Sequence, residues 1–420
     1  MKARLRCGLG SMVAVLLLGG IAVAQNAVAD WDAIALKTIV SVGKKALPST
    51  SVFFAYESLA VYDAVNAIDG RYTPFAVPYK ASPHASKDAA AVSAAHDVLV
   101  HYFPAQKTDL DNALTTSLDA IPNGTAKDEG IQVGQAVAAA WITLRANDGL
   151  EAPIVYLPGH GPGIWEPVPP SFPPPVAPWL GQMLPFTLTG PSQFLPGGPP
   201  PLNSDEWAFN YTLTKIFGAK NSSVRTPPQT DIGLFWTDNT ATQYSNLFRK
   251  LAAQRHLGTA DTARLFAMAN VTVADSMIGC FNAKYHFAFW RPITAIRAGD
   301  TDGNPDTIAD PNWEPLAATP GHPEYPAAHG CWTEAAMDIL TYFFGTRQME
   351  FSVDSAVTKN THSFHSFDDV VEEVDLARIF GGMHYLHSVL DGNDIGRKVA
   401  RHITRNYFLP AGHQVGENQQ

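Results

Sequence analysis

The chain has 420 residues, of which 46% are hydrophobic and 16% are charged, and its formal net charge is −10. This composition is typical of a globular protein with a large core in one or two domains. An acidic chain disfavours nucleic acid and anionic membranes as partners. No run beyond the N-terminus is long and apolar enough to predict a membrane span, which excludes an integral membrane protein.

Residues 1–29 have the pattern of a secretion signal. Three basic residues precede an apolar run from Met12 to Ala24, which is too short to span a bilayer. Small-residue patterns predict cleavage after Ala24 or after Ala29; a buried helix and an uncleaved anchor are the alternatives. We therefore expect an exported protein, periplasmic or extracellular, whose net charge changes from −10 to −13 with the loss of those three residues.

Two cysteines remain after removal of the signal, Cys280 and Cys331. In an exported chain they are able to form one disulfide. Neither has the spacing of a zinc site, so the sequence gives no support to zinc, iron–sulfur or disulfide-scaffold proteins.

The first half after the signal, residues 30–150, is predicted to be a helical bundle. Residues 51–68 place apolar and aromatic side chains at spacings of three and four, and the pattern stops at Asp69-Gly70. The same periodicity predicts helices over 89–103, 107–121 and 125–146. Alternating β patterns with Asn-Gly turns are nearly absent.

Residues 151–202 differ in composition from the rest of the chain. Residues 153–201 hold 16 of the 32 prolines, a density that excludes regular helix and sheet. A flexible linker is one interpretation. The segment also contains Trp165, Trp179 and three phenylalanines, and disordered linkers rarely carry so many aromatic residues. We therefore expect an ordered, extended strap that packs on a helical body.

The helical pattern resumes in residues 203–420. It predicts helices over 204–217, 231–236, 242–257, 261–290, 329–344, 368–376 and 384–407. The order of helices, strap and helices predicts an all-α fold with two helical bundles or one large one.

Three segments of this second half concentrate polar chemistry. In the first, Lys284 and Arg291 are seven residues apart, which places both on one face of a helix that Pro292 then ends. Two cations on one face suit a tetrahedral oxyanion such as phosphate or vanadate. A solvated basic face is the alternative.

The second segment is Gly321-His-Pro-Glu-Tyr-Pro-Ala-Ala-His329-Gly, a rigid loop before a helical pattern. A helix N-terminus offers free backbone N–H groups and the positive end of the dipole to an anion. His329 at that point is suited to proton transfer near neutral pH. A capping or structural histidine is the alternative.

In the third segment, Gly381 and Gly382 separate Arg378 from His384. Paired glycines let backbones approach closely, and we expect His384 near a helix start, with Ser388 one turn on. A helix break followed by an ordinary amphipathic helix is the alternative.

Together the three segments resemble the signature shared by vanadium-dependent haloperoxidases and type 2 phosphatidic acid phosphatases, which reads K-x6-RP, PSGH and SR-x5-H-xxx-D. The matching positions are Lys284 to Pro292, Pro326 to His329, and Ala377 to Ser388. A weaker resemblance over most of the chain is to secreted bacterial haloperoxidase-like proteins.

The resemblance implies an all-α fold of two four-helix bundles with the site in the second. It implies that His384 binds vanadium through its ring nitrogen and that His329 handles the protons of hydrogen peroxide. Three cations and one backbone N–H would neutralise the oxygens of the vanadate cofactor: Lys284, Arg291, Arg378 and the N–H of Ala328.

Four positions depart from the family pattern. Ala327 replaces a serine that would donate to the oxyanion, a bond of about 1.5–3 kcal/mol. Ala328 replaces a glycine, and Ala377 replaces a serine. Ser388 replaces an aspartate and is expected to orient His384 more weakly, because Asp391 is nearly a turn too far to substitute. No first-line charged residue is lost, so an active oxyanion site is expected.

His322 stands where chloroperoxidases of this family carry Phe and algal bromoperoxidases carry His, which favours bromide or iodide. A surface loop histidine is the alternative. Phe281 matches a position that is often Trp in the family and is expected to line the halide pocket. Because Cys280 and Cys331 flank the first two motifs, we hypothesise a disulfide between them.

Three hypotheses follow. The first is an exported haloperoxidase that oxidises bromide or iodide with hydrogen peroxide to hypohalous acid at histidine-bound vanadate. The second is an acid phosphatase in which His384 attacks phosphorus and His329 protonates the leaving group. The third is a non-catalytic helical binding protein with a degenerate site. The expected partners are peroxide, halide and small organic or phosphate-ester substrates, without nucleic acid or a membrane span; an oligomer is compatible with the sequence.

Overall fold

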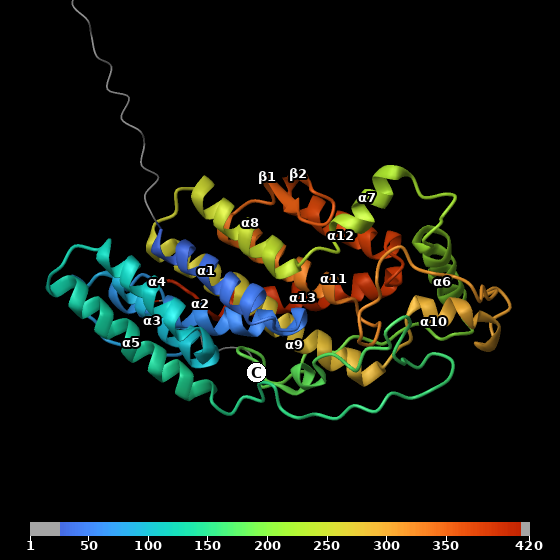
Figure 1. Cartoon of the computed structure of the whole chain (residues 1–420), viewed down its shortest axis with the longest axis horizontal. Coiled ribbons are helices and arrows are strands. Elements are labelled where there is room, and N and C mark those ends of the chain that lie inside the picture. The colour runs from blue at the N-terminus through green and yellow to red at the C-terminus, as the bar shows by residue number, and fades with distance from the viewer. Residues whose placement is uncertain (1–25, 413–420) are drawn as a thin grey trace, which may run out of the picture.

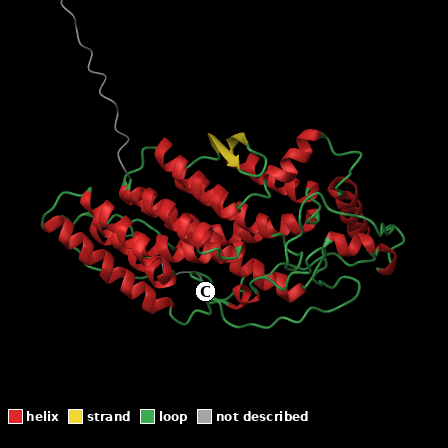
Figure 2. Ribbon diagram, in the orientation of Figure 1, coloured by secondary structure: helices red, strands yellow, loops and turns green. Residues whose placement is uncertain are grey.

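The computed structural model describes residues 26–412, which form a mostly helical protein with two groups of helices joined by extended chain (Figures 1 and 2). This confirms the all-α fold class. Residues 1–25, which hold most of the expected secretion signal, lie outside the described residues.

The N-terminal group is built around the buried helix α2 (Figure 1). Helix α2 has Pro48 in its first turn, where a missing N–H costs nothing, and it stops at Gly70, whose φ is +70°. The helices of the group are α1 (Ala27–Leu36, continued by a π-helical turn over Lys37–Val42), α2 (Leu47–Asp69), α3 (Lys87–Tyr102), α4 (Lys107–Asp119) and α5 (Thr125–Arg145).

The C-terminal group includes the long helix α9, which packs against α11, α13 and also α2. Its helices are α6 (Asp205–Gly218), α7 (Pro227–Phe235), α8 (Thr240–Gln254), α9 (Thr259–Phe287), α10 (Pro292–Arg297), α11 (Ala328–Phe344), α12 (Phe367–Phe380) and α13 (Leu386–Asn406). Capping boxes begin α7 at Thr226 and α12 at Ser366.

The sequence analysis did not predict the short helix α10 or the β-hairpin between α11 and α12. Strands β1 (Gln348–Ser355) and β2 (Asn360–Ser366) pair antiparallel, with Phe351 opposite Phe364. In β1, Met349 and Val353 are buried between more exposed neighbours. Such alternation is the sequence pattern of a half-buried strand, so the hairpin in residues 345–367 was predictable from the sequence.

The two groups share one hydrophobic core, which extends from Val28 in α1 to Phe408 beyond α13. Helix α2 packs along α9, and α1 packs against α8. The predicted boundaries at residues 150 and 203 therefore do not separate two hydrophobic cores. The division of the chain into two domains stays a prediction.

Helix α9 is apolar enough to resemble a membrane span, although it is a core helix. Among the described helices, it alone is long and apolar enough to cross a membrane by length and composition, with a mean hydropathy of 1.2 over its most apolar stretch, yet 94% of that stretch is buried inside the protein. The sequence analysis found no such run. Its burial against α2 and α11 accounts for its apolar character.

The proline-rich strap is ordered and extended, as predicted, and its regular structure is one 3-10 turn over Pro178–Gln182. Trp165 is fully buried. Asp275 of α9 anchors the strap, because its carboxylate accepts hydrogen bonds from the backbone N–H of Phe186 and from both the N–H and the hydroxyl of Thr187.

We predict that Asp275→Asn destabilises the protein by about 3 kcal/mol, since an amide cannot accept all three bonds and bonds to a buried charge contribute about 1.5–3 kcal/mol each. The free energy of unfolding in urea measures this. Asp109→Asn, at an exposed position in α4, is the matched control. Equal free energies of unfolding for the two variants would show that Asp275 does not anchor the strap.

Candidate active site

His384 lies in the loop between α12 and α13. Helix α12 ends at Phe380, and Gly382 adopts a φ of +72° against Gly218, whose carbonyl oxygen would lie 2.5 Å from an added Cβ. Only glycine fits such a contact. The sequence analysis started a helix at His384; α13 begins two residues later, at Leu386. The tight loop leaves His384 only 2% exposed.

Glu324 holds the ring of His384. Its Oε1 lies 2.9 Å from His384 Nδ1, while Arg291 Nη1 lies 3.2 Å from Nε2. Because a guanidinium can only donate, Nε2 carries the lone pair, and Nδ1 donates its proton to Glu324. Burial and the nearby cations, Arg291 first, lower the pKa of His384 well below its usual value. The neutral ring therefore offers Nε2 as a ligand or nucleophile.

Ser388 acts on His384 through Glu324. Its hydroxyl donates to Glu324 Oε2 at 2.7 Å, and the N–H of Tyr385 donates to Oε1 at 3.1 Å. The expectation that Ser388 itself orients the histidine is therefore corrected, because the short side chain reaches the carboxylate. Asp391, expected to be too distant, accepts instead from the Tyr325 hydroxyl.

Glu324 is fully buried, and desolvation raises its pKa to about 7. Three donors surround its two oxygens. In a buried site such bonds favour the carboxylate form and fix the direction of the histidine ring.

Arg291 contacts His384, but it does not lie on the helix that the sequence predicted. Helix α9 ends at Phe287, and Arg291 is the N-cap of α10. Its Nε donates to the His322 carbonyl at 2.9 Å, Nη1 donates to the Met383 carbonyl at 2.9 Å, and Nη2 lies 3.0 Å from His322 Nδ1. The non-helical segment 288–291 between α9 and α10, rather than a shared helix face, carries Arg291 to the neighbourhood of Lys284.

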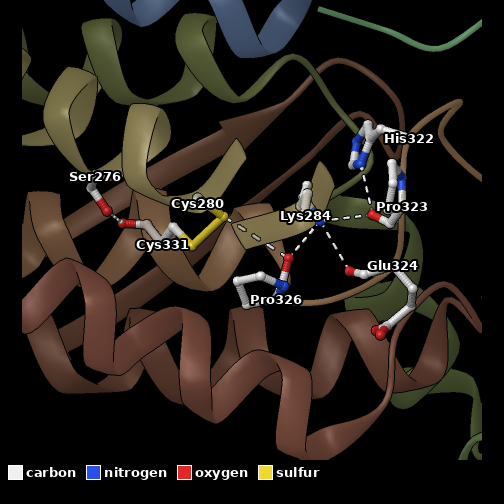
Figure 3. The surroundings of a disulfide bond; sticks show 8 residues. All are labelled: Ser276, Cys280, Lys284, His322, Pro323, Glu324, Pro326 and Cys331. Atoms are coloured by element: carbon white, nitrogen blue, oxygen red, sulfur yellow. Dashed lines mark hydrogen bonds between the residues drawn. A yellow bond between two sulfur atoms is a disulfide. The ribbon is translucent and has the colours of Figure 1, made fainter. Parts of the chain in front are cut away.

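Lys284 is fully buried and ties down the loop that carries Glu324 (Figure 3). Its Nζ donates to the carbonyls of Pro323 at 3.0 Å, Glu324 at 2.9 Å and also Pro326. Burial and the charge of Arg291 lower its pKa well below the usual value. The predicted contact of Lys284 with a bound oxyanion stays a prediction.

The hypothesised disulfide between Cys280 and Cys331 is present and joins α9 to α11 (Figure 3). Cys280 lies one turn before Lys284, and Cys331 lies in the first turn of α11. Beside it, the Ser276 hydroxyl donates to the Cys331 carbonyl at 2.8 Å. The crosslink thus fixes the start of α11 relative to Lys284.

Arg378 and the start of α11 offer unused donors. Arg378 Nη2 donates to the Trp236 carbonyl at 2.6 Å, whereas its buried Nε has no hydrogen-bond partner in residues 26–412. Helix α11 has Ala327 as its N-cap, without a side-chain cap, so the first N–H groups, including that of Ala328, lack an intrahelical partner. Both groups are suited to an anion.

His329 follows Ala328 and is half-buried. Its Nε2 lies 3.1 Å from the Thr240 hydroxyl. Burial, together with the charges of Arg378 and Lys284, lowers the pKa of His329 well below its usual value. The ring is therefore neutral near pH 7 and able to accept a proton.

His329, Arg378 and His384 line a cavity of about 350 Å³, whereas Lys284 and Arg291 do not. One wall is polar, with His322, Ala328, His329, Arg378 and His384, and the rest is mostly apolar, with Ala46, Leu47, Pro48, Val176, Met277, Pro320, Gly321 and Trp332, beside Thr240. The start of α2 and the strap therefore complete a site that the family resemblance assigned to the second bundle alone.

The two residues expected in the halide pocket are placed differently. His322 lines the cavity and is 5% exposed, rather than lying on the surface. Phe281 is fully buried and packs behind His322, with ring centroids 5.2 Å apart. The expectation that Phe281 lines the cavity is corrected: Met277, one helical turn earlier, lines it, whereas Phe281 is fully buried against His322.

The site carries an excess of buried positive charge. Lys284, Arg291 and Arg378 are each at most 1% exposed, and none forms an ion pair with a carboxylate in the described chain. Glu324 is the one acidic side chain bonded within this group. Desolvation lowers the pKa of Arg291 to about 10 and that of Arg378 to about 9. Three buried cations are stable only when a bound anion or nearby dipoles compensate their charge.

Sequence reasoning missed Glu324, Met277, Trp332 and Thr240. Glu324 lay inside the second motif, and its signal was an acidic residue in a segment otherwise made of apolar, glycine, proline and histidine residues. The other three come from separate helices, α9, α11 and α8, and no local pattern marked them.

The fold and the site together define a helical protein in which a buried histidine lies beside a group of buried cations. The family model described as the VCPO second helical-bundle domain matches residues 264–408. A vanadium chloroperoxidase from Curvularia inaequalis is 30% identical over an alignment that covers 41% of this chain and 33% of that protein. The chain thus matches about a third of the length of this curated relative.

Solved structures show the same fold over more of the chain. A bacterial vanadium-dependent iodoperoxidase aligns with a TM-score of 0.78 and 22% identity over 92% of this chain and 97% of that one. A holo-type bacterial vanadium-dependent chloroperoxidase aligns with a TM-score of 0.67 and 16% identity over 85% and 90%. The resemblance is confirmed for one domain and for the fold: residues 264–408 match the second helical-bundle domain, and the chain shares the fold of these two haloperoxidases over 92% and 85% of its length.

We predict that Glu324→Gln weakens binding of orthovanadate about 10–100-fold, as is usual when a residue that orients a ligand histidine is lost. Glutamine has the same size but presents an amide where His384 Nδ1 donates. Isothermal titration calorimetry measures the affinity. Glu372→Gln, at an exposed position in α12, is the control. An unchanged affinity in Glu324→Gln would show that the carboxylate does not orient the site.

Proposed function

We propose that this protein is a vanadium-dependent haloperoxidase, which oxidises bromide or iodide with hydrogen peroxide to hypohalous acid. The observation that carries the proposal is the lone pair of His384 Nε2, held by Glu324 beside an excess of buried positive charge. Residues 264–408, which hold these groups, match the family model.

Vanadate suits these residues. It is an anion that needs one nitrogen ligand and several donors to its oxygens, and the donor set comprises His384 Nε2, the unpaired Nε of Arg378 and the uncapped start of α11. Lys284 and Arg291 add positive charge close by. When bound, vanadate supplies the Lewis acid that polarises peroxide for attack by halide.

The chain's own residues handle charge and protons. Glu324 keeps the proton of His384 on Nδ1, so that Nε2 keeps its lone pair, to which Arg291 Nη1 donates at 3.2 Å and which a ligand would take over. The lowered pKa of His329 favours a neutral ring that accepts a proton from peroxide, and the Thr240 hydroxyl orients that ring. The mostly apolar walls limit water around the cations, which strengthens their hold on an anion.

An acid phosphatase remains the second candidate, because His384 Nε2 is equally suited to attack phosphorus and form a phosphohistidine. The leaving group would then need a proton from His329. Near neutral pH the lowered pKa of His329 leaves little of the protonated ring that this step needs, which favours the haloperoxidase.

The choice of halide rests on His322. Its ring lines the cavity and lies 3.0 Å from Arg291. An imidazole at this position, in place of an aromatic hydrocarbon ring, supports bromide or iodide over chloride, as inferred from the family. Small organic compounds that take up halogen are the proposed final acceptors.

We predict that orthovanadate added to the purified apoprotein produces bromide and iodide oxidation with hydrogen peroxide. His384→Ala should lose this activity at least about 100-fold, since the cofactor loses its nitrogen ligand. His402→Ala, a histidine away from the cavity that bonds to the Thr187 carbonyl, is the control and should retain it. Halide oxidation and hydrolysis of p-nitrophenyl phosphate are measured in parallel.

Phosphate-ester hydrolysis that vanadate inhibits, with no halide turnover, would replace the proposal by the phosphatase. Inactivity in both assays would favour a binding protein. Full activity in His384→Ala would show that the site is assigned wrongly.

We further propose that the protein is exported and that the signal is removed after Ala24. In support, Asn26 caps α1, and its Nδ2 donates to Leu257 at 2.9 Å and to Thr262 at 2.7 Å. Val28 is buried. Cleavage after Ala29 would remove these contacts.

We therefore predict that protein recovered from the periplasm or the medium begins at Gln25. Intact mass and N-terminal sequencing test this. A mature chain that begins at Asp30 would contradict the preferred cleavage position, and retention of the whole N-terminus in the cytoplasm would contradict export.

A further inference from the structure

Met277 is the one described methionine that lines the cavity. It lies in α9, two helical turns before Lys284, and is 2% exposed. It shares the cavity with His322, Arg378 and His384. The other described methionines are buried elsewhere: Met183, Met268, Met337, Met349 and Met383.

We propose that Met277 is a built-in oxidation site, converted to methionine sulfoxide by hypohalous acid formed in the same cavity. The inference rests on the proposed function, which supplies the oxidant. It assigns to Met277 a modification that limits how many turnovers one molecule completes.

The chemistry balances with no further reagent. A lone pair of the thioether sulfur attacks the halogen of hypohalous acid and releases hydroxide, and water then displaces halide from sulfur. In sum, one thioether and one hypohalous acid give one sulfoxide, one proton and one halide. Sulfur loses two electrons, the halogen gains them, and the halide is free to be oxidised again.

The cavity makes Met277 the preferred internal target. The only cysteines of the described chain, Cys280 and Cys331, are joined in a disulfide, so no thiol competes there. Trp332 also lines the cavity, but a thioether is the softer and more polarisable group. An oxidant formed beside it reacts at high effective concentration before it diffuses away.

Oxidation at this position would change the site. The sulfoxide is polar, and Met277 belongs to the mostly apolar wall that includes Leu47 and Trp332. A polar group there admits water beside the buried cations and weakens their hold on an anion. Activity should therefore fall as sulfoxide accumulates.

Met349 provides an internal reference. It lies beside a separate surface hollow with Arg255, Glu350 and His365, and it is 4% exposed. Oxidant that arrives from solution has access to this hollow as well as to the cavity. Oxidant generated at His384 meets Met277 first.

The test uses the vanadate-loaded protein with bromide and hydrogen peroxide, in an excess of free methionine that removes hypobromous acid from solution. Peptide mass mapping follows each methionine over time, and dilute hypobromous acid added to resting protein is the comparison. We expect the ratio of Met277 to Met349 sulfoxide to be about tenfold higher in turnover, because the scavenger protects only residues reached through solution.

Met277→Leu conserves volume and should complete several-fold more turnovers before its own initial rate halves. Met268→Leu, in the core part of α9, should behave like the native protein. The inference is overturned if bromide is oxidised while Met277 stays unmodified or follows Met349, even if Met277→Leu fails to fold. Absence of halide oxidation overturns the proposed function and the inference together, and the bromide assay identifies that case.

Discussion

The site depends on one buried carboxylate, Glu324, which holds a histidine in a region with an excess of buried cations. It fixes the proton of His384 on Nδ1 and is itself held by the Ser388 hydroxyl and the Tyr385 N–H. Removal of these bonds would leave the imidazole free to change tautomer and orientation. With them, the ring keeps its lone pair on Nε2, next to Arg291 at the edge of the cavity, which is preorganisation of the kind that catalysis requires.

The rest of the C-terminal fold keeps this carboxylate in place. Lys284 donates to three carbonyls of the loop on either side of it, and the disulfide between Cys280 and Cys331 ties the helix after that loop to α9. Buried cations are costly, and here Lys284 is stabilised by carbonyl dipoles rather than by a carboxylate. The remaining positive charge is available to an anion, in a chain whose net charge of −10 would otherwise repel one.

The sequence allowed the helical fold, the strap and the main cations to be predicted, because periodicity, proline density and motif order are local signals. Positions fixed by three-dimensional contacts were misjudged. Arg291 seemed to share a helix with Lys284, but α9 ends at Phe287. Ser388 was taken as the partner of His384, although the carboxylate comes from a loop 60 residues earlier. The roles of the site residues in catalysis stay predictions.

Glu324 also explains how the site tolerates its departure from the family pattern. The aspartate of the third motif is absent at Ser388, yet a carboxylate still contacts His384, supplied by the second motif. The small hydroxyl at Ser388 leaves room for Glu324 and donates to its second oxygen. The Ser388 hydroxyl on α13 and the Glu324 carboxylate on the loop therefore act together to hold His384. A change of Ser388 back to aspartate would place two buried carboxylates together, and like charges at that distance oppose ionisation of both.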